Sequence, residues 1–278
     1  MKTFSFQALV AKEFREAVRS RWLLGLIAVF CFLAFGLSWI GTAASTIRGY
    51  SGFGRTSAAL VNLVLLIVPL MGLTMGAFSL AGERERRTLD LLLVLPLRPA
   101  HIFWAKALGL GAALTAALSA AFGLSGLTLA FRGGLRDGGL YLAFFSATLL
   151  LAFCTMSLGL WISALNRRIA PAIGIALVAW FGFVLGGDLG FLGMSAAVRL
   201  SPEALLATAW LNPLSLYRLL AVDVLGAHLD MLGPAGLCAQ DLLGPRFRAC
   251  VLAGLGGWFF AALSLAYLSY HRHPLREG

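Results

Sequence analysis

Six apolar segments of about twenty residues or more constrain this chain more than any other feature. At about 1.5 Å rise per residue, a helix of that length crosses the roughly 30 Å hydrocarbon core of a bilayer. Charged residues make up only 12% of the chain and the mean hydropathy is +0.88, so lipid must serve as solvent for much of it. We predict an all-α polytopic membrane protein, a single transmembrane domain over residues 1–278. The predicted spans are 22–44, 58–80, 102–130, 139–165, 169–187 and 249–267.

The basic residues predict the orientation of the spans. Of the 22 Lys and Arg residues, fourteen fall on the side with both chain ends, and eight fall on the other side. The positive-inside rule places the first side in the cytoplasm, so we predict cytoplasmic termini and an external segment at 188–248. Because the basic residues flank apolar segments, membrane topology explains the formal charge of +10, and we expect no nucleic acid partner.

Residues 1–21 precede the first span, and 4–22 has the pattern of an amphipathic helix. Such a helix lies in the membrane interface in contact with lipid. A simple anchor that orients the chain is the alternative. The apolar positions are Phe6, Val10, Phe14, Val18 and Trp22, and the charged positions are Lys12, Glu13, Arg15, Glu16 and Arg19.

The predicted spans hold few groups that could do chemistry, which argues against several functions. Lys106 is their only charged residue, whereas an ion-coupled carrier usually needs ionisable groups at depth. All four histidines lie outside the spans, which argues against an intramembrane serine protease. No Gly-rich phosphate loop ending in Lys-Ser/Thr occurs. We expect a non-catalytic chain with no cofactor of its own, either driven by a partner or purely structural.

The external segment 188–248 carries two helix-start signals. Ser201 and Asn212 are each followed by proline, the arrangement of an N-cap and the first helical position. Beyond Asn212 an apolar stripe follows one helical face, with a Tyr-Arg pair of the types enriched in interface hot spots. We predict a structured surface that docks an external partner; a stripe on the outer leaflet or against the helix bundle is the alternative. The predicted docking residues are Leu214, Tyr217, Arg218, Leu220 and Val224.

Sulfur-containing residues offer one candidate metal site. Met71 and Met75 lie one helical turn apart in the second span, and thioethers suit Cu(I). Packing is the alternative, because such Met pairs usually fill space in a membrane helix. The four cysteines show neither C-x-x-C nor zinc-like spacing, and the sequence leaves open whether Cys238 and Cys250 are free, paired or metal-bound.

The segment 82–100 joins the second and third spans on the cytoplasmic side. A charged cluster at 83–87 leads into a short apolar helix at 89–95 that ends at Pro96 and is too short to cross the membrane. Its apolar face needs either a groove on a partner protein or a lipid surface. The residues alone leave both interpretations open.

This segment resembles the loop that couples type-2 ABC exporter permeases to their ATPase. The six-span layout, the amphipathic start and the long external loop are similar too, although the family often has Gly where this chain has Arg87. The resemblance implies a homodimer in the bacterial inner membrane, bound to two copies of a cytoplasmic ATPase that handles ATP and Mg²⁺. The implied ATPase-coupling residues are Glu83, Arg84, Glu85, Thr88, Leu89, Leu92, Leu95 and Pro96.

Short motifs at 21–24, 201–203 and 211–219 resemble a narrower group, the permeases of the ABC system that assembles the copper centres of bacterial nitrous oxide reductase. That resemblance implies a periplasmic β-helical partner and a cargo of copper or a sulfur species. The alternatives are a permease for a drug, lipid or other hydrophobic compound, and a membrane scaffold that transports nothing. Neighbouring genes would distinguish the two permeases, and a copurifying ATPase would distinguish both from the scaffold.

Overall fold

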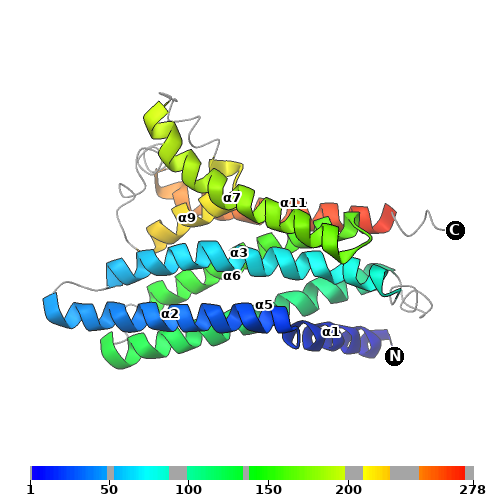
Figure 1. Ribbon diagram of the computed structural model, residues 1–278, viewed down its shortest axis with the longest axis horizontal. Helices are drawn as coiled ribbons and strands as arrows, with labels where there is room; N and C mark the ends of the chain where they lie inside the picture. The colour runs from blue at the N-terminus through cyan, green and yellow to red at the C-terminus, as the bar shows by residue number, and fades with distance from the viewer. Residues whose placement is uncertain are drawn as a thin grey trace.

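The computed structural model of the protein is a bundle of long helices that run roughly side by side (Figure 1). It describes residues 2–48, 53–87, 99–133, 138–197, 209–225 and 244–272. Within these residues six helices are long and apolar enough to cross a membrane, which confirms the predicted number of spans. The elements are α1 (Lys2–Val18), α2 (Arg21–Arg48), α3 (Phe53–Glu85), α5 (Pro99–Gly133), α6 (Gly138–Leu165), α7 (Ile169–Ala197), α9 (Pro213–Val224), the 3-10 turn η3 (Gly244–Arg246) and α11 (Phe247–Arg272).

The first and last helices share one end of the bundle. Figure 1 shows α1 at the same end as the C-terminal part of α11, as an even number of crossings requires. We refer to this as the α1 end, and to the opposite end, where α9 lies, as the α9 end. Several predicted features lie outside the described residues: the helix start at Ser201 and the coupling residues Thr88, Leu89, Leu92, Leu95 and Pro96.

Several helix boundaries differ from the prediction: α7, for example, continues past position 187 to Ala197, and two other differences bear on the site. The segment 4–22 is not one helix, because α1 ends at Val18 and α2 begins at Arg21 after a turn closed by a hydrogen bond from the N–H of Ser20 to the carbonyl of Ala17, 3.1 Å. The second span was predicted to end at position 80, but α3 continues to Glu85. The charged residues 83–85 therefore belong to a helix, whose regular geometry fixes their directions.

The closest helix contact in the bundle joins α3 and α6. Gly72 and Gly76 of α3 lie against the backbone of α6, and Gly159 of α6 lies against that of α3. A Cβ atom at Gly76 would collide with the carbonyl oxygen of Met156, and one at Gly159 with that of Leu73. Small residues suit such sites because membrane helices associate through close packing and polar contacts rather than through exclusion of water.

Hydroxyl groups add polar contacts between the spans. The Ser163 hydroxyl on α6 accepts hydrogen bonds from the backbone N–H groups of Leu80 and Ala81 on α3, at 3.0 and 2.8 Å. The hydroxyls of Ser38 on α2 and Ser125 on α5 form a buried pair, 2.5 Å apart. These contacts fix the rotation of each helix relative to its neighbour.

Helix α9 is built into the bundle at the α9 end. Its N-cap is Asn212, whose Oδ1 accepts from the N–H of Leu214 at 2.9 Å, and whose Nδ2 donates to the carbonyl of Phe183 on α7 at 2.7 Å. The hydroxyl of Tyr217 lies 2.9 Å from that of Thr148 on α6. The predicted helix start at Asn212 is confirmed, and α9 belongs to the core rather than to a separate external unit.

We predict that Gly159→Ala destabilises the protein by about 1–3 kcal/mol, because its methyl group meets the backbone of α3, which cannot give way. Gly123→Ala is the matched control: it lies in another membrane helix, and a Cβ there has no atom within 4 Å. The measurement is thermal loss of monodisperse protein in detergent, followed by size-exclusion chromatography. Equal stability of the two variants would contradict the close approach of α3 and α6.

Candidate functional site

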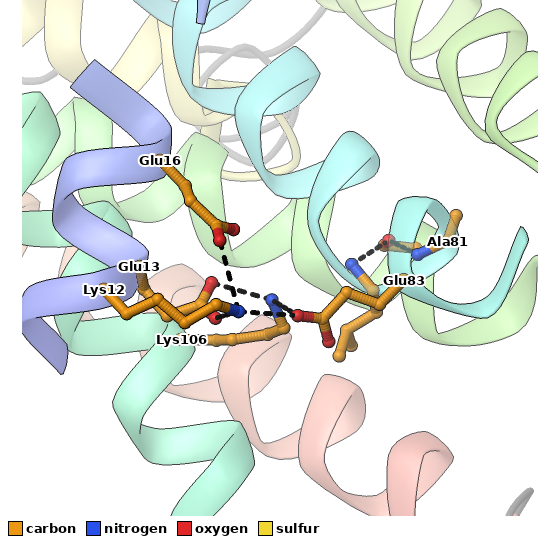
Figure 2. Close-up of polar contacts among 8 residues, drawn as sticks. Lys12, Glu13, Glu16, Ala81, Glu83 and Lys106 are labelled. Carbon is orange, nitrogen blue, oxygen red and sulfur yellow. Dashed lines mark hydrogen bonds and ion pairs between the residues drawn. The ribbon is translucent and has the colours of Figure 1, made fainter. Parts of the chain in front are cut away.

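Charged side chains from α1, α3 and α5 meet at the α1 end of the bundle (Figure 2). We refer to Lys12, Glu13, Glu16, Glu83 and Lys106 as the ionic cluster. At its centre, Lys106 Nζ lies 2.7 Å from Glu13 Oε2 and 2.9 Å from Glu83 Oε1. The side chains of Lys106, Glu13 and Glu83 are only 3%, 5% and 11% exposed, so these charges depend on one another rather than on water.

Lys12 covers the cluster on its exposed side. Its Nζ lies 3.3 Å from Glu13 Oε1, 3.4 Å from Glu16 Oε1 and 3.6 Å from Glu83 Oε1. Burial lowers the pKa of Lys12, but the nearby carboxylates of Glu13, Glu83 and Glu16 outweigh that effect and raise its pKa above the usual 10.5. The Lys12 ammonium group is therefore charged at pH 7, where it offsets the carboxylates.

Close packing of α1 against α5 brings Glu13 to Lys106. Leu9, Glu13 and Ala17 follow one another at four-residue spacing on the buried face of α1. Gly109 on α5 makes room for this face, because a Cβ atom there would lie 2.5 Å from the Cβ of Glu13. Glu13 therefore points toward α5. The sequence pattern had predicted that it lies on the charged face of an amphipathic helix, turned away from lipid.

The next two residues of α3 bind the turn between α6 and α7. Arg84 Nη1 donates to the carbonyls of Ala164 and Asn166 at the end of α6, at 2.7 and 3.1 Å. Glu85 Oε2 accepts from the N–H of Ile169, the first residue of α7, at 2.6 Å. Each charge lies at the helix end that favours it, a cation at a C-terminus and an anion at an N-terminus.

Three consecutive side chains, Glu83, Arg84 and Glu85, thus connect the end of α3 to α5, α6 and α7, and Glu83 also approaches Lys12 on α1. This arrangement offers a mechanical linkage rather than catalysis. In the part of the chain that the structure describes, no group of three or more His, Cys, Asp or Glu residues is placed to hold a metal ion.

Comparison with known proteins shows the family of this chain. The family model described as "ABC-2 family transporter protein" matches residues 7–275. The chain belongs to the ABC-2 transporter family. It is similar to two curated proteins, each described as "Probable ABC transporter permease protein NosY". That of Pseudomonas aeruginosa is 32% identical over 273 residues, 96% of this chain and 98% of that protein. That of Stutzerimonas stutzeri is 32% identical over 272 residues, 95% and 97% of the two chains.

In this ABC-2 permease, the three predicted coupling residues that the structure describes differ in exposure. Glu83 is turned inward to Lys106, Arg84 is half-buried, and Glu85 is exposed. Among these three residues, Glu83 therefore contacts a neighbouring helix, and Glu85 is the most accessible to a protein partner. The predicted coupling helix at 89–95 follows directly in the chain, outside the described residues.

The last turn of α3 ends in a strained backbone. Arg87 has a φ of 55°, in the left-handed region that favours glycine, and its N–H donates to the carbonyl of Arg84 at 3.1 Å. A residue other than glycine there costs about 1 kcal/mol.

The predicted docking stripe needs a correction. Tyr217 is 0% exposed, Leu214 3% and Leu220 2%, all within the main apolar core. The apolar stripe packs against the helix bundle, because this face of α9 is turned toward α6 and α11. It is therefore covered neither by an external partner nor by the outer leaflet. Arg218 and Val224 are half-buried at the edge of that face. A partner at the α9 end would have to contact surfaces other than the stripe.

The sulfur-containing side chains pack in the interior. Met71 and Met75 are 1% and 7% exposed and belong to the same apolar core, so packing accounts for both, and metal binding there stays a prediction. Cys31 and Cys154 are free thiols within the membrane helices. Cys250 is also a free thiol in the structure.

Sequence reasoning missed the partnership between Glu13 and Lys106. One signal was available: Lys106 is the only charged residue in the predicted spans, and a charge at that depth needs a partner. A second signal was the four-residue spacing of Glu13 from Leu9 and Ala17, which puts it on an otherwise apolar face. What could not be read from the sequence is which helix lies beside that face.

We predict that Lys106→Met destabilises the protein by about 3–5 kcal/mol, because it leaves two buried carboxylates without their shared cation. Lys12→Met is the matched control; Lys12 is 42% exposed, and its loss should cost about 0–1 kcal/mol. Adding Glu13→Gln and Glu83→Gln to Lys106→Met should recover much of the lost stability. Thermal unfolding in detergent measures the stability of the two lysine variants and of the triple variant. An equal loss of stability in Lys106→Met and Lys12→Met would contradict the central role of Lys106.

We also predict that Tyr217→Ala lowers stability by about 3–5 kcal/mol, because it empties a fully buried site and removes the partner of Thr148. Leu211→Ala is the control in the same segment, since Leu211 is 71% exposed. Folded yield and thermal unfolding are the readouts. A Tyr217→Ala protein that folds normally but fails to capture a periplasmic partner would restore the docking interpretation of the stripe.

Proposed function

We propose that this ABC-2 permease couples ATP hydrolysis by two copies of a cytoplasmic ATPase to the assembly of the copper centres of nitrous oxide reductase. Similarity to proteins named NosY over nearly the whole chain supports this proposal. In this proposal the permease works as a homodimer in the bacterial inner membrane with cytoplasmic termini. Copper, a sulfur species or a conformational signal reaches a periplasmic partner of β-helical form.

One observation carries the coupling step: Glu83, Arg84 and Glu85 bind three different helices immediately before residues 88–98. A partner that moves this segment pulls on the last turn of α3. Charge-assisted hydrogen bonds are stronger than neutral ones, and partly buried pairs are less screened by salt. The displacement therefore passes to α5, α6 and α7 together rather than being lost in a flexible joint.

The far end of the bundle is connected to the same helices. Tyr217 joins α9 to α6, and Asn212 joins it to α7. At the end of α9, Asp223 forms an ion pair with Arg248 near the start of α11. A shift of α6 or α7 at the α1 end therefore reaches α9, which borders the external segment that would meet the periplasmic partner.

The proposal predicts that coupling and ATPase binding can be separated. Glu85→Gln removes the anion at the start of α7 but leaves residues 88–98 intact, so we expect full ATPase copurification with several-fold less copper in the reductase. Leu92→Glu puts a charge into the apolar docking face, so we expect loss of both the ATPase and the copper. Arg19→Gln is the control, because Arg19 is an exposed charged residue at the same end and lies outside the ionic cluster.

The measurements are the ATPase-to-permease ratio after affinity purification from a nitrous oxide-respiring host and the copper content of the purified reductase. A reductase with full copper in a strain lacking this chain would overturn the proposed function. A wild-type chain that never copurifies with an ATPase would favour the scaffold. An ATPase-bound chain without any effect on the reductase would favour an exporter of another compound.

A further inference from the structure

Tyr270, in the last turn of α11, is a buried polar residue that the proposed coupling step does not involve. It is 1% exposed and belongs to the main apolar core. Its ring lies against that of Phe103 on α5, with the two ring centroids 5.8 Å apart. Because Phe103 precedes Lys106 by about one helical turn, Tyr270 lies beside the ionic cluster.

The hydroxyl of Tyr270 has no hydrogen-bond partner among the described residues. Tyr217 is equally buried, and its hydroxyl lies 2.9 Å from that of Thr148. A phenyl ring would fill the site of Tyr270 without a polar atom, and a buried hydroxyl that makes no hydrogen bond lowers the stability of a fold. Such a group needs an explanation, and a partner that is reached only in another conformation would provide one.

Glu83 is the acceptor that the surroundings of Tyr270 offer. Glu83 and Arg84 at the end of α3 lie near enough to the Tyr270 hydroxyl for their charges to act on it. Of the two, only the carboxylate can accept a hydroxyl proton, because a guanidinium group has donors alone. A carboxylate offers about four acceptor positions, so Glu83 can accept this hydrogen bond and keep its ion pair with Lys106.

The contacts at the end of α3 allow the shift that would bring the two groups together. The ion pair and hydrogen bonds of residues 83–85 hold α5, α6 and α7, so these helices follow a displacement of residues 88–98. Tyr270 of α11 meets α5 through a ring contact with Phe103. A ring contact is weaker and less directional than a charge-assisted hydrogen bond, so this boundary can shift more easily.

We propose that Tyr270 is a positioning residue, whose hydroxyl donates a hydrogen bond to Glu83 only in the conformation that ATP binding to the partner favours. In that conformation the bond attaches α11 to the end of α3, and the last span joins the movement of the other helices. The ATP-bound ATPase can favour this conformation only if the two conformations differ in their contacts, and this bond is one such difference. The proposal rests on the coupling to an ATPase, but not on copper as the cargo.

The first test compares variants of the full-length permease without ATP. Tyr270→Phe should keep or raise the unfolding temperature in detergent, because the hydroxyl that it removes has no partner in this conformation. Tyr217→Phe is the matched control, and it should lower the unfolding temperature because it removes the contact with Thr148. A lower unfolding temperature for Tyr270→Phe would show that the hydroxyl already has a partner, such as a bound water molecule, and would overturn the proposal.

The second test adds a non-hydrolysable ATP analogue to the permease copurified with its ATPase. Tyr270→Phe should weaken the apparent affinity of the complex for the analogue by about tenfold, as loss of a hydrogen bond to a charged group from the favoured conformation predicts. Tyr267→Phe removes a hydroxyl about one turn earlier on the same helix and should leave the affinity unchanged. A residue that only fills space would show neither the unchanged unfolding temperature together with the weaker affinity nor this difference between the two tyrosines.

The outcomes separate this proposal from the proposed function. Unchanged affinity in Tyr270→Phe with the ATPase bound would overturn this proposal alone. The same tenfold loss on adding Tyr270→Phe to Glu83→Gln would place the acceptor elsewhere and would also overturn it. A wild-type chain that copurifies with no ATPase would overturn both proposals, whereas a reductase with full copper in a strain lacking this chain would overturn only the proposed function.

Discussion

A cation buried among membrane helices must have anions within reach, and Lys106 has two, from helices far apart in the sequence. Glu13 comes from the helix that precedes the first span, and Glu83 from the last turn of the second. Because removing any one partner leaves an uncompensated charge, the three helices can separate only at a high cost in free energy. The position of α1 along α5, and with it the entry of the chain into the bundle, follows from this pairing.

The second constraint is the backbone contact between α3 and α6. Glycines at 72, 76 and 159 bring the two helices so close that neither can slide past the other without a collision. Where the glycines end, Ser163 continues the contact with hydrogen bonds to the backbone of α3. The pair therefore provides a stiff connection between the ionic cluster and α9, two sites at opposite ends of the bundle.

Local features of the sequence were predicted well, and long-range ones were not. The six spans and the helix start at Asn212 depend on hydropathy and capping within a few residues, so the sequence contains them. The partner of an apolar or charged face depends on which helix lies beside it. Hence the stripe around Tyr217 was recognised as covered but assigned to an external protein, whereas α6 and α11 cover it. The Glu13–Lys106 pair was missed for the same reason.

The diverging contacts at the end of α3 limit how that helix can move. Rotation about its own axis would carry Glu83 away from α5 and, in the same turn, Glu85 away from α7. Tilting would strain the glycine contact with α6. The motion of α3 that keeps all of these contacts is a joint displacement with α5, α6 and α7. A force applied at the end of α3 would therefore move these four helices as one body.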